Sequence, residues 1–164
     1  MTVHGPSFDV EGPVRAEVFV VWLHDGRLEL TGPCGSEPWM LEIGASEHPV
    51  EVVSRIVGAA IGKPILVHST SWRRDHDAVI LSFVVVIDAT LVRSMASTPI
   101  IRVDLARSQA ATAPATIAFA QVVEHGLRHL AWLIQDDPVV AAELPPGWAS
   151  ALVDYVPEPF RALG

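Results

Sequence analysis

The chain has 164 residues, half of them apolar and 18% charged, which suits one folded domain and not a disordered segment. Its net charge of -8 offers no basic surface for DNA or RNA, so we expect no nucleic-acid partner. The only cysteine, Cys34, can form no internal disulfide, which fits a reducing compartment. The start of the chain has no signal-like apolar core, and residues 79–87 are far too few to cross a bilayer. We therefore expect a cytoplasmic protein with no membrane partner.

Residues 1–13 hold Pro, Gly and acidic groups and are expected to form a flexible lead-in. The β-branched and aromatic run 14–23, the Asp25-Gly26 pair and the alternating residues 28–30 predict a β-hairpin. A short strand over residues 39–43 follows a loop rich in Gly and Pro.

A helix is predicted over roughly 49–61, because Pro49 suits a first turn and Gly62 a C-terminal stop. Its apolar positions are mainly valines on one side. Its polar edge is narrow, which indicates a largely buried helix.

Two paired strands are predicted next, over 65–72 and 78–88, joined by the polar loop 73–77. The second shows little alternation, which is typical of a strand that is covered on both faces. Another strand is predicted over 99–103.

The pattern then becomes helical, over 116–135, from Pro138 and over 148–155. The polar side of the first of these helices is expected to face solvent; it holds Gln121, Glu124, His125, Arg128 and Gln135. We predict that residues 14–109 form an α/β (α+β) domain and that 110–164 are a helical C-terminal extension packed on it.

Around the first helix the sequence resembles the signature of the Nudix hydrolases. Arg55 stands at the arginine of that motif, and Glu47 lies eight residues before it as the motif requires. Val57 takes the apolar position and Gly62 the closing glycine. This resemblance covers residues 14–88 and implies a Nudix-like mixed sheet flanked by helices.

The departures from the motif fall on its chemistry. Ile56, Ala59 and Ala60 stand where the motif has glutamates, and Leu41 stands at its opening glycine. Nudix-type cleavage of a diphosphate depends on Mg²⁺ or Mn²⁺, which need hard oxygen ligands that these side chains lack. We therefore expect no metal and no cofactor, and we interpret the chain as a Nudix-like protein without standard hydrolysis that binds a small, nucleotide-like ligand or serves as an interaction module.

An enzymatic alternative remains, in which Glu42, Glu47 and Glu51 rebuild a displaced Mg²⁺ or Mn²⁺ site for hydrolysis of a nucleoside diphosphate linkage. Acidic residues also favour helix N-termini for electrostatic reasons alone, which is the simpler explanation of this cluster.

Trp72, Arg73 and Arg74 are candidate ligand-binding residues, because an aromatic ring can stack on a base while guanidinium groups hold a phosphate. A solvated turn explains the same residues, since Asp75 and Asp77 are interspersed with them.

His125 and His129 are one helical turn apart, a spacing that can serve a metal, but no third ligand accompanies them. We expect a partly buried histidine pair instead. A third interpretation is a structural protein or homodimer that uses apolar C-terminal surface, namely Trp132, Trp148 and Phe160.

Overall fold

The computed structural model describes residues 12–33, 37–103 and 118–157, which form a six-stranded mixed sheet with helices. Residues 1–11, 34–36, 104–117 and 158–164 lie outside this description, and with them Cys34 and Phe160. The strands are β1 (Val14–His24), β2 (Arg27–Thr31), β3 (Trp39–Ile43), β4 (Leu66–Asp75), β5 (Ala78–Val86) and β6 (Thr98–Pro99). The helices are α1 (Pro49–Ala60), α2 (Phe119–Asp136), α3 (Pro138–Glu143), α4 (Trp148–Ala151) and the short 3-10 turn η1 (Ala89–Leu91).

The sheet is built around β1, and its strands follow the order β4-β5-β1-β2-β6. β1 is parallel to β5 and antiparallel to β2, while β3 pairs with the first half of β1. Asp25 and Gly26 both adopt positive φ angles, as a two-residue hairpin turn with the twist of its strands requires. The predicted hairpin is thus confirmed.

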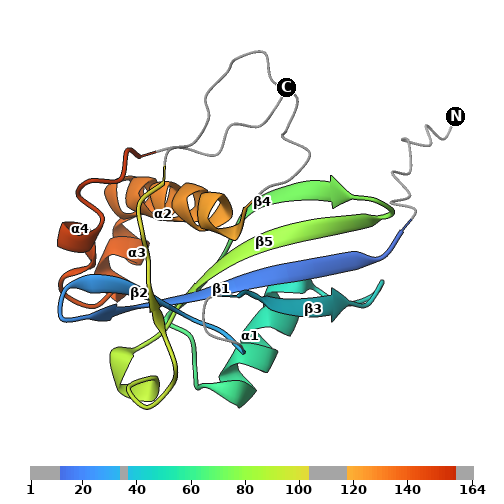
Figure 1. Cartoon of the computed structure of the whole chain (residues 1–164), viewed down its shortest axis with the longest axis horizontal. Coiled ribbons are helices and arrows are strands. Elements are labelled where there is room, and N and C mark those ends of the chain that lie inside the picture. The colour runs from blue at the N-terminus through green and yellow to red at the C-terminus, as the bar shows by residue number, and fades with distance from the viewer. Residues whose placement is uncertain (1–11, 34–36, 104–117, 158–164) are drawn as a thin grey trace, which may run out of the picture.

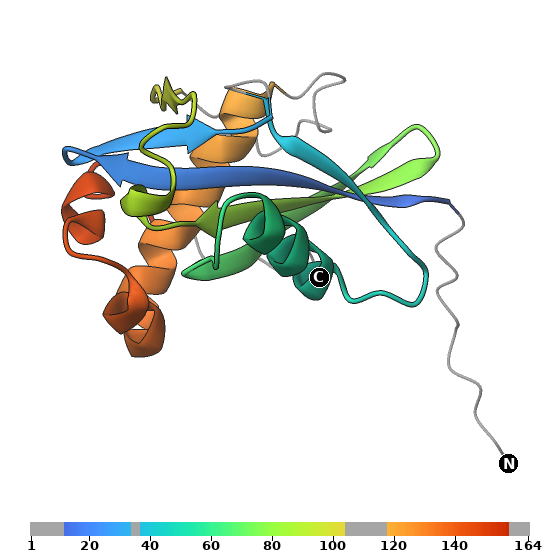
Figure 2. The ribbon, with the colours of Figure 1, turned by 90° about the horizontal axis from the view of Figure 1, so that it is seen from below.

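Helices cover both faces of the sheet, with α1 on one side and α2, α3 and α4 on the other (Figures 1 and 2). Successive side chains of β1 therefore enter two separate cores. Val18 and Val20 pack on the α1 side, and Phe19 and Val21 pack on the α2 side. The same division holds for β5, which explains why its sequence is apolar without alternation.

The helix α2 approaches the sheet closely at Gly126. A Cβ atom on this residue would lie 2.5 Å from Cγ2 of Val84 in β5 and 3.5 Å from Cγ2 of Thr70 in β4. Glycine is thus required here by contact distance, and it sets how deeply the helix lies on the sheet.

The predicted helix over 49–61 agrees with α1. The predicted C-terminal helices are present as α2, which ends at Asp136, α3 and α4, of which α4 ends at Ala151 and not at 155, while residues 116–117 of the first predicted helix lie outside the described residues. Two predictions about strands need correction. Strand β4 continues to Asp75, so the connection to β5 is a turn at His76 and Asp77 and not the loop 73–77. The strand predicted over 99–103 is only Thr98–Pro99. Within the described part of the chain, no helix is both long and apolar enough to cross a membrane.

The prediction that the polar side of α2 faces solvent is wrong for two residues. Glu124 and Arg128 are buried, because Arg102 brings a guanidinium group onto the carboxylate of Glu124. Trp148 is also buried, at 2% exposure, and so offers no contact surface to a partner.

Candidate functional site

Glu47 and Arg55, which match two positions of the motif, contact each other, Glu47 from just before α1 and Arg55 from within it. Glu47 Oε1 accepts a hydrogen bond from Arg55 Nη2 at 3.1 Å, and its Oε2 accepts one from the Gly44 amide at 2.9 Å. The hydrogen bond from the Gly44 amide, and to a smaller extent the one from Arg55, lowers the pKa of Glu47 below its ordinary value. The carboxylate therefore closes the loop before the helix and holds the Arg55 side chain.

The positions that carry glutamates in the Nudix motif offer no oxygen to a metal. Ile56 is half-buried and packs against the core on the α1 side of the sheet. Ala59 and Ala60 are exposed near the end of α1. Aliphatic side chains have no lone pairs, so this part of α1 cannot hold a divalent cation through side chains.

The three acidic residues of the enzymatic alternative do not converge in the structure. Glu42 lies on β3 and accepts a hydrogen bond from Arg15 Nε at 2.7 Å. Glu47 is held by Arg55, and Glu51 is exposed in the first turn of α1. Among the described residues, no group of three or more His, Cys, Asp or Glu side chains is placed to hold a metal ion.

Trp72, Arg73 and Arg74 all lie on strand β4, where successive side chains point to opposite faces. Trp72 is 64% exposed and Arg74 is also exposed. Arg73 instead points to the α2 side, where it meets Glu17. The predicted cluster of an aromatic ring with two guanidinium groups is thus divided between the two faces of the sheet.

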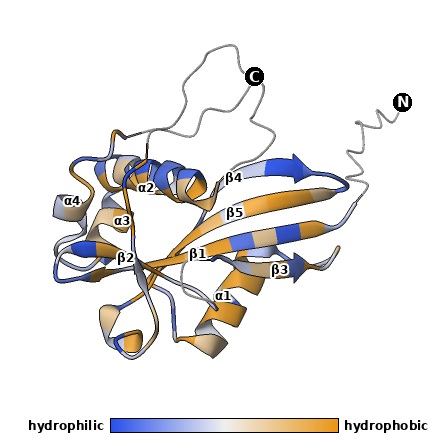
Figure 3. Ribbon diagram, viewed as in Figure 1, coloured by the Kyte–Doolittle hydropathy of each residue, from blue (hydrophilic) through white to orange (hydrophobic). Residues whose placement is uncertain are grey.

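Glu17 is a fully buried carboxylate in the central strand β1, at 0% exposure. Figure 3 shows hydrophilic bands near the start of this strand, which is otherwise largely apolar. Both Nη atoms of Arg73 donate to it, one of them at 2.8 Å, and Ser82 Oγ donates at 2.6 Å. The hydrogen bonds to Glu17 are the main reason why the pKa of Arg73 is raised. The sequence contained a signal, since Glu17 and Ser82 are polar residues within two largely apolar strands. The structure places them opposite each other in the parallel register.

The two histidines predicted on α2 as a partly buried pair are a half-buried His125 and a His129 that is 3% exposed. His129 Nδ1 lies 2.9 Å from Nε2 of His68 on β4, and its ring stacks on His68 and on Trp132. Burial, together with the neighbouring His68 and His125, lowers the pKa of His129 to about 4. These neutral imidazoles therefore join α2 to the edge of the sheet.

A second ionic cluster, centred on the buried Glu124, joins α2 to the segment after β6. Arg102 and Arg128 both donate to Oε1 of Glu124, at 3.0 Å in each case. The guanidinium carbon of Arg102 lies 4.0 Å from the ring centre of Tyr155, and burial raises the pKa of that tyrosine to about 12. This cluster fixes the C-terminal helices on the domain. It was absent from the sequence-based candidates because Arg102 is remote in sequence from both Glu124 and Tyr155.

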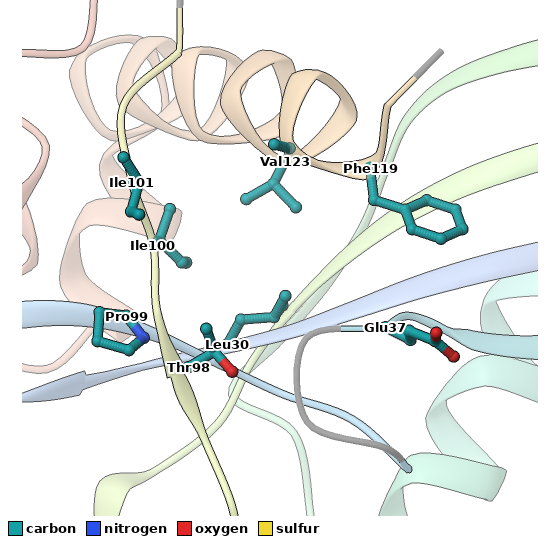
Figure 4. Close-up of a pocket in the computed structure, with 9 residues that line it drawn as sticks. Leu30, Glu37, Thr98, Pro99, Ile100, Ile101, Phe119 and Val123 are labelled. Carbon is teal, nitrogen blue, oxygen red and sulfur yellow. The ribbon is translucent and has the colours of Figure 1, made fainter. Parts of the chain in front are cut away.

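An open pocket of about 410 Å³ lies between β2, β6 and the start of α2 (Figure 4). Most of the side chains around it are apolar, including Leu30, Pro99, Ile100, Ile101, Phe119 and Val123. Glu37 and Thr98 add a carboxylate and a hydroxyl group. Neither Trp72, Arg73 nor Arg74 is among its lining residues.

No protein-family model matches the sequence, and a comparison with curated proteins found no match.

Proposed function

We propose that this chain is a Nudix-like protein that binds a small ligand and does not cleave diphosphates by the usual metal-dependent route. The observation that carries the proposal is the chemistry of α1. Ile56 packs into the core, while Ala59 and Ala60 present only methyl groups to solvent where the motif has glutamates.

The order of elements supports the resemblance on which the proposal rests. A hairpin, a short strand with Trp39, the helix α1 and the pair β4–β5 follow one another, as the resemblance implies. The contact of Glu47 with Arg55 joins two residues that match the motif and lie eight positions apart. Both observations agree with the element order and spacing of the motif. The departures affect the positions that would bind metal.

Hydrolysis of a diphosphate needs cations that neutralise the phosphate oxygens and activate water. Of the three acidic candidates, Glu42 is engaged with Arg15 and Glu47 with Gly44 and Arg55, which leaves Glu51 as an exposed carboxylate in the first turn of α1. One carboxylate is too few to hold the cations that the reaction needs. A cation that bound Glu42 or Glu47 would have to displace Arg15 or Arg55. The carboxylate would then lose the ion pair that it now has with that arginine. The geometry therefore favours binding over hydrolysis.

The test is a Mn²⁺ titration followed by electron paramagnetic resonance, with a variant that restores carboxylates. Ala59→Glu/Ala60→Glu is expected to gain a Mn²⁺ site, because both positions are exposed and a charged side chain fits there. The matched control Ala59→Gln/Ala60→Gln has similar size without charge and should bind no better than the wild type. A Mn²⁺ site in the wild type that is as strong as in the glutamate variant would overturn the proposal.

A hydrolysis screen completes the test, with nucleoside triphosphates, sugar nucleotides, dinucleotides and NADH, each with Mg²⁺ or Mn²⁺, read by mass spectrometry. No turnover is expected. Turnover that EDTA abolishes, and that Glu42→Gln/Glu47→Gln/Glu51→Gln removes, would favour the enzymatic alternative instead.

A further inference from the structure

The pocket beside β2, β6 and α2 has the size and surface of a small-molecule site. Its volume of about 410 Å³ falls within the ~300–1,000 Å³ of ligand pockets in proteins. Ile101 and Phe119, on two sides of it, are 77% and 42% exposed, although large apolar side chains are more stable away from water. A ligand that covered them would gain this hydrophobic free energy.

The polar groups of the pocket limit the charge of such a ligand. Among the described lining residues, Glu37 is the only ionisable one, and the whole chain carries a net charge of -8. Figure 4 shows Glu37 on the same side of the pocket as Phe119, away from Pro99 and Ile101. Among the described lining residues a phosphate would meet a carboxylate and no arginine, which disfavours anions.

We propose that this pocket binds a small, largely apolar molecule that is uncharged or cationic. This inference rests on the proposed function, because it assigns a site and a ligand class to a protein that binds its ligand without hydrolysing it. The occupant is thus an apolar ring or chain compound and not a nucleoside diphosphate.

Two fluorescent probes that share their aromatic rings test this assignment. Phenylnaphthylamine is uncharged and has one N–H donor, while anilinonaphthalene sulfonate adds a negative charge. Phenylnaphthylamine should bind saturably and more tightly than the sulfonate. Glu37→Gln keeps an acceptor but removes the charge, so it should tighten binding of the sulfonate and leave phenylnaphthylamine nearly unchanged.

A filled pocket provides the second test. Ala120 lines the pocket from an exposed position on α2, so Ala120→Phe should place a phenyl ring in it without disturbing the core. Affinity for phenylnaphthylamine should fall by about tenfold or more, equivalent to about 1.4 kcal/mol. The control Ala141→Phe, on an exposed position of α3 that is not part of the pocket lining, should bind as the wild type does.

Methyl NMR locates the probe without any substitution. Isoleucine methyl signals of Ile100 and Ile101 should shift on addition of phenylnaphthylamine, whereas Ile56 and Ile61, in the core on the α1 side, should not. Absence of saturable binding, equal loss in both phenylalanine variants or tighter binding of the sulfonate would each overturn the inference. Such a failure leaves the metal titration and the hydrolysis screen unaffected, so it is distinguishable from failure of the proposed function.

Discussion

Arg73 on β4 reaches past β5 to hold the buried carboxylate of Glu17 on β1, using both Nη atoms. Three strands are thereby joined by one ion pair, since Ser82 of β5 donates to the same carboxylate. A residue that appeared in the sequence to be a candidate for binding phosphate is thus occupied by an internal partner.

Removal of Arg73 alone should destabilise the protein strongly, because it leaves the carboxylate of Glu17 buried without a counter-charge. We expect Arg73→Met to lower the free energy of unfolding by about 2–4 kcal/mol, below the full effect of a deeply buried pair because Arg73 is 24% exposed. The double variant Glu17→Met/Arg73→Met should be less destabilised than Arg73→Met. Urea unfolding measures the free energy of unfolding of both variants. Equal values would show that the buried Glu17 carboxylate costs no stability when Arg73 is absent.

Gly126→Ala should also destabilise the protein, because the new methyl group would lie 2.5 Å from Cγ2 of the buried Val84. We expect a loss of about 1–3 kcal/mol from overpacking, seen as a lower melting temperature. Gly58→Ala is the matched control in α1, where an added Cβ meets nothing within 4 Å. This change should stabilise the helix by about 0.5–1 kcal/mol, and similar losses at the two sites would contradict the close approach of α2 to the sheet.

The stability of the protein should fall as the pH drops from about 6.5 to about 4. Burial and the adjacent His68 and His125 lower the pKa of His129 from 6.5 to about 4. Above pH 6.5 the residue is neutral in both states and contributes no pH dependence. Below it, the unfolded chain takes up a proton that the folded protein excludes, which favours unfolding.

Urea unfolding at several pH values checks this prediction. His129→Gln should flatten the decline between pH 6.5 and 4, although it also loses the stacking on His68 and Trp132. An identical slope in the variant and in the wild type would exclude His129 as its source.

Trp148→Ala should act through the core and not through an interface. The ring is 2% exposed and belongs to the core on the α2 side, so its removal should cost about 3–5 kcal/mol. Because Trp148 is internal to one chain, the loss should be the same at low and high protein concentration. A loss that grows with concentration would support the oligomeric interpretation.

The local elements follow from short-range patterns. Pro49 at the start and the buried valines within the helix were sufficient to predict α1, and Asp25-Gly26 was sufficient to predict the first hairpin. The apolar run of β5 predicted a strand with two covered faces. The presence of Ile56, Ala59 and Ala60 at the glutamate positions of the motif could also be seen in the sequence, because it depends only on residue identity.

The tertiary structure decided which polar residues are buried and which partners they have. Glu17 and Arg73 are 56 positions apart, and Arg102 and Glu124 are 22 apart. An amphipathic pattern assigns charged residues to solvent, but a guanidinium group from another element can neutralise a carboxylate and bury it. For the same reason the sequence did not predict the contact of His129 with His68 on β4, since contacts between elements depend on how the strands and helices pack.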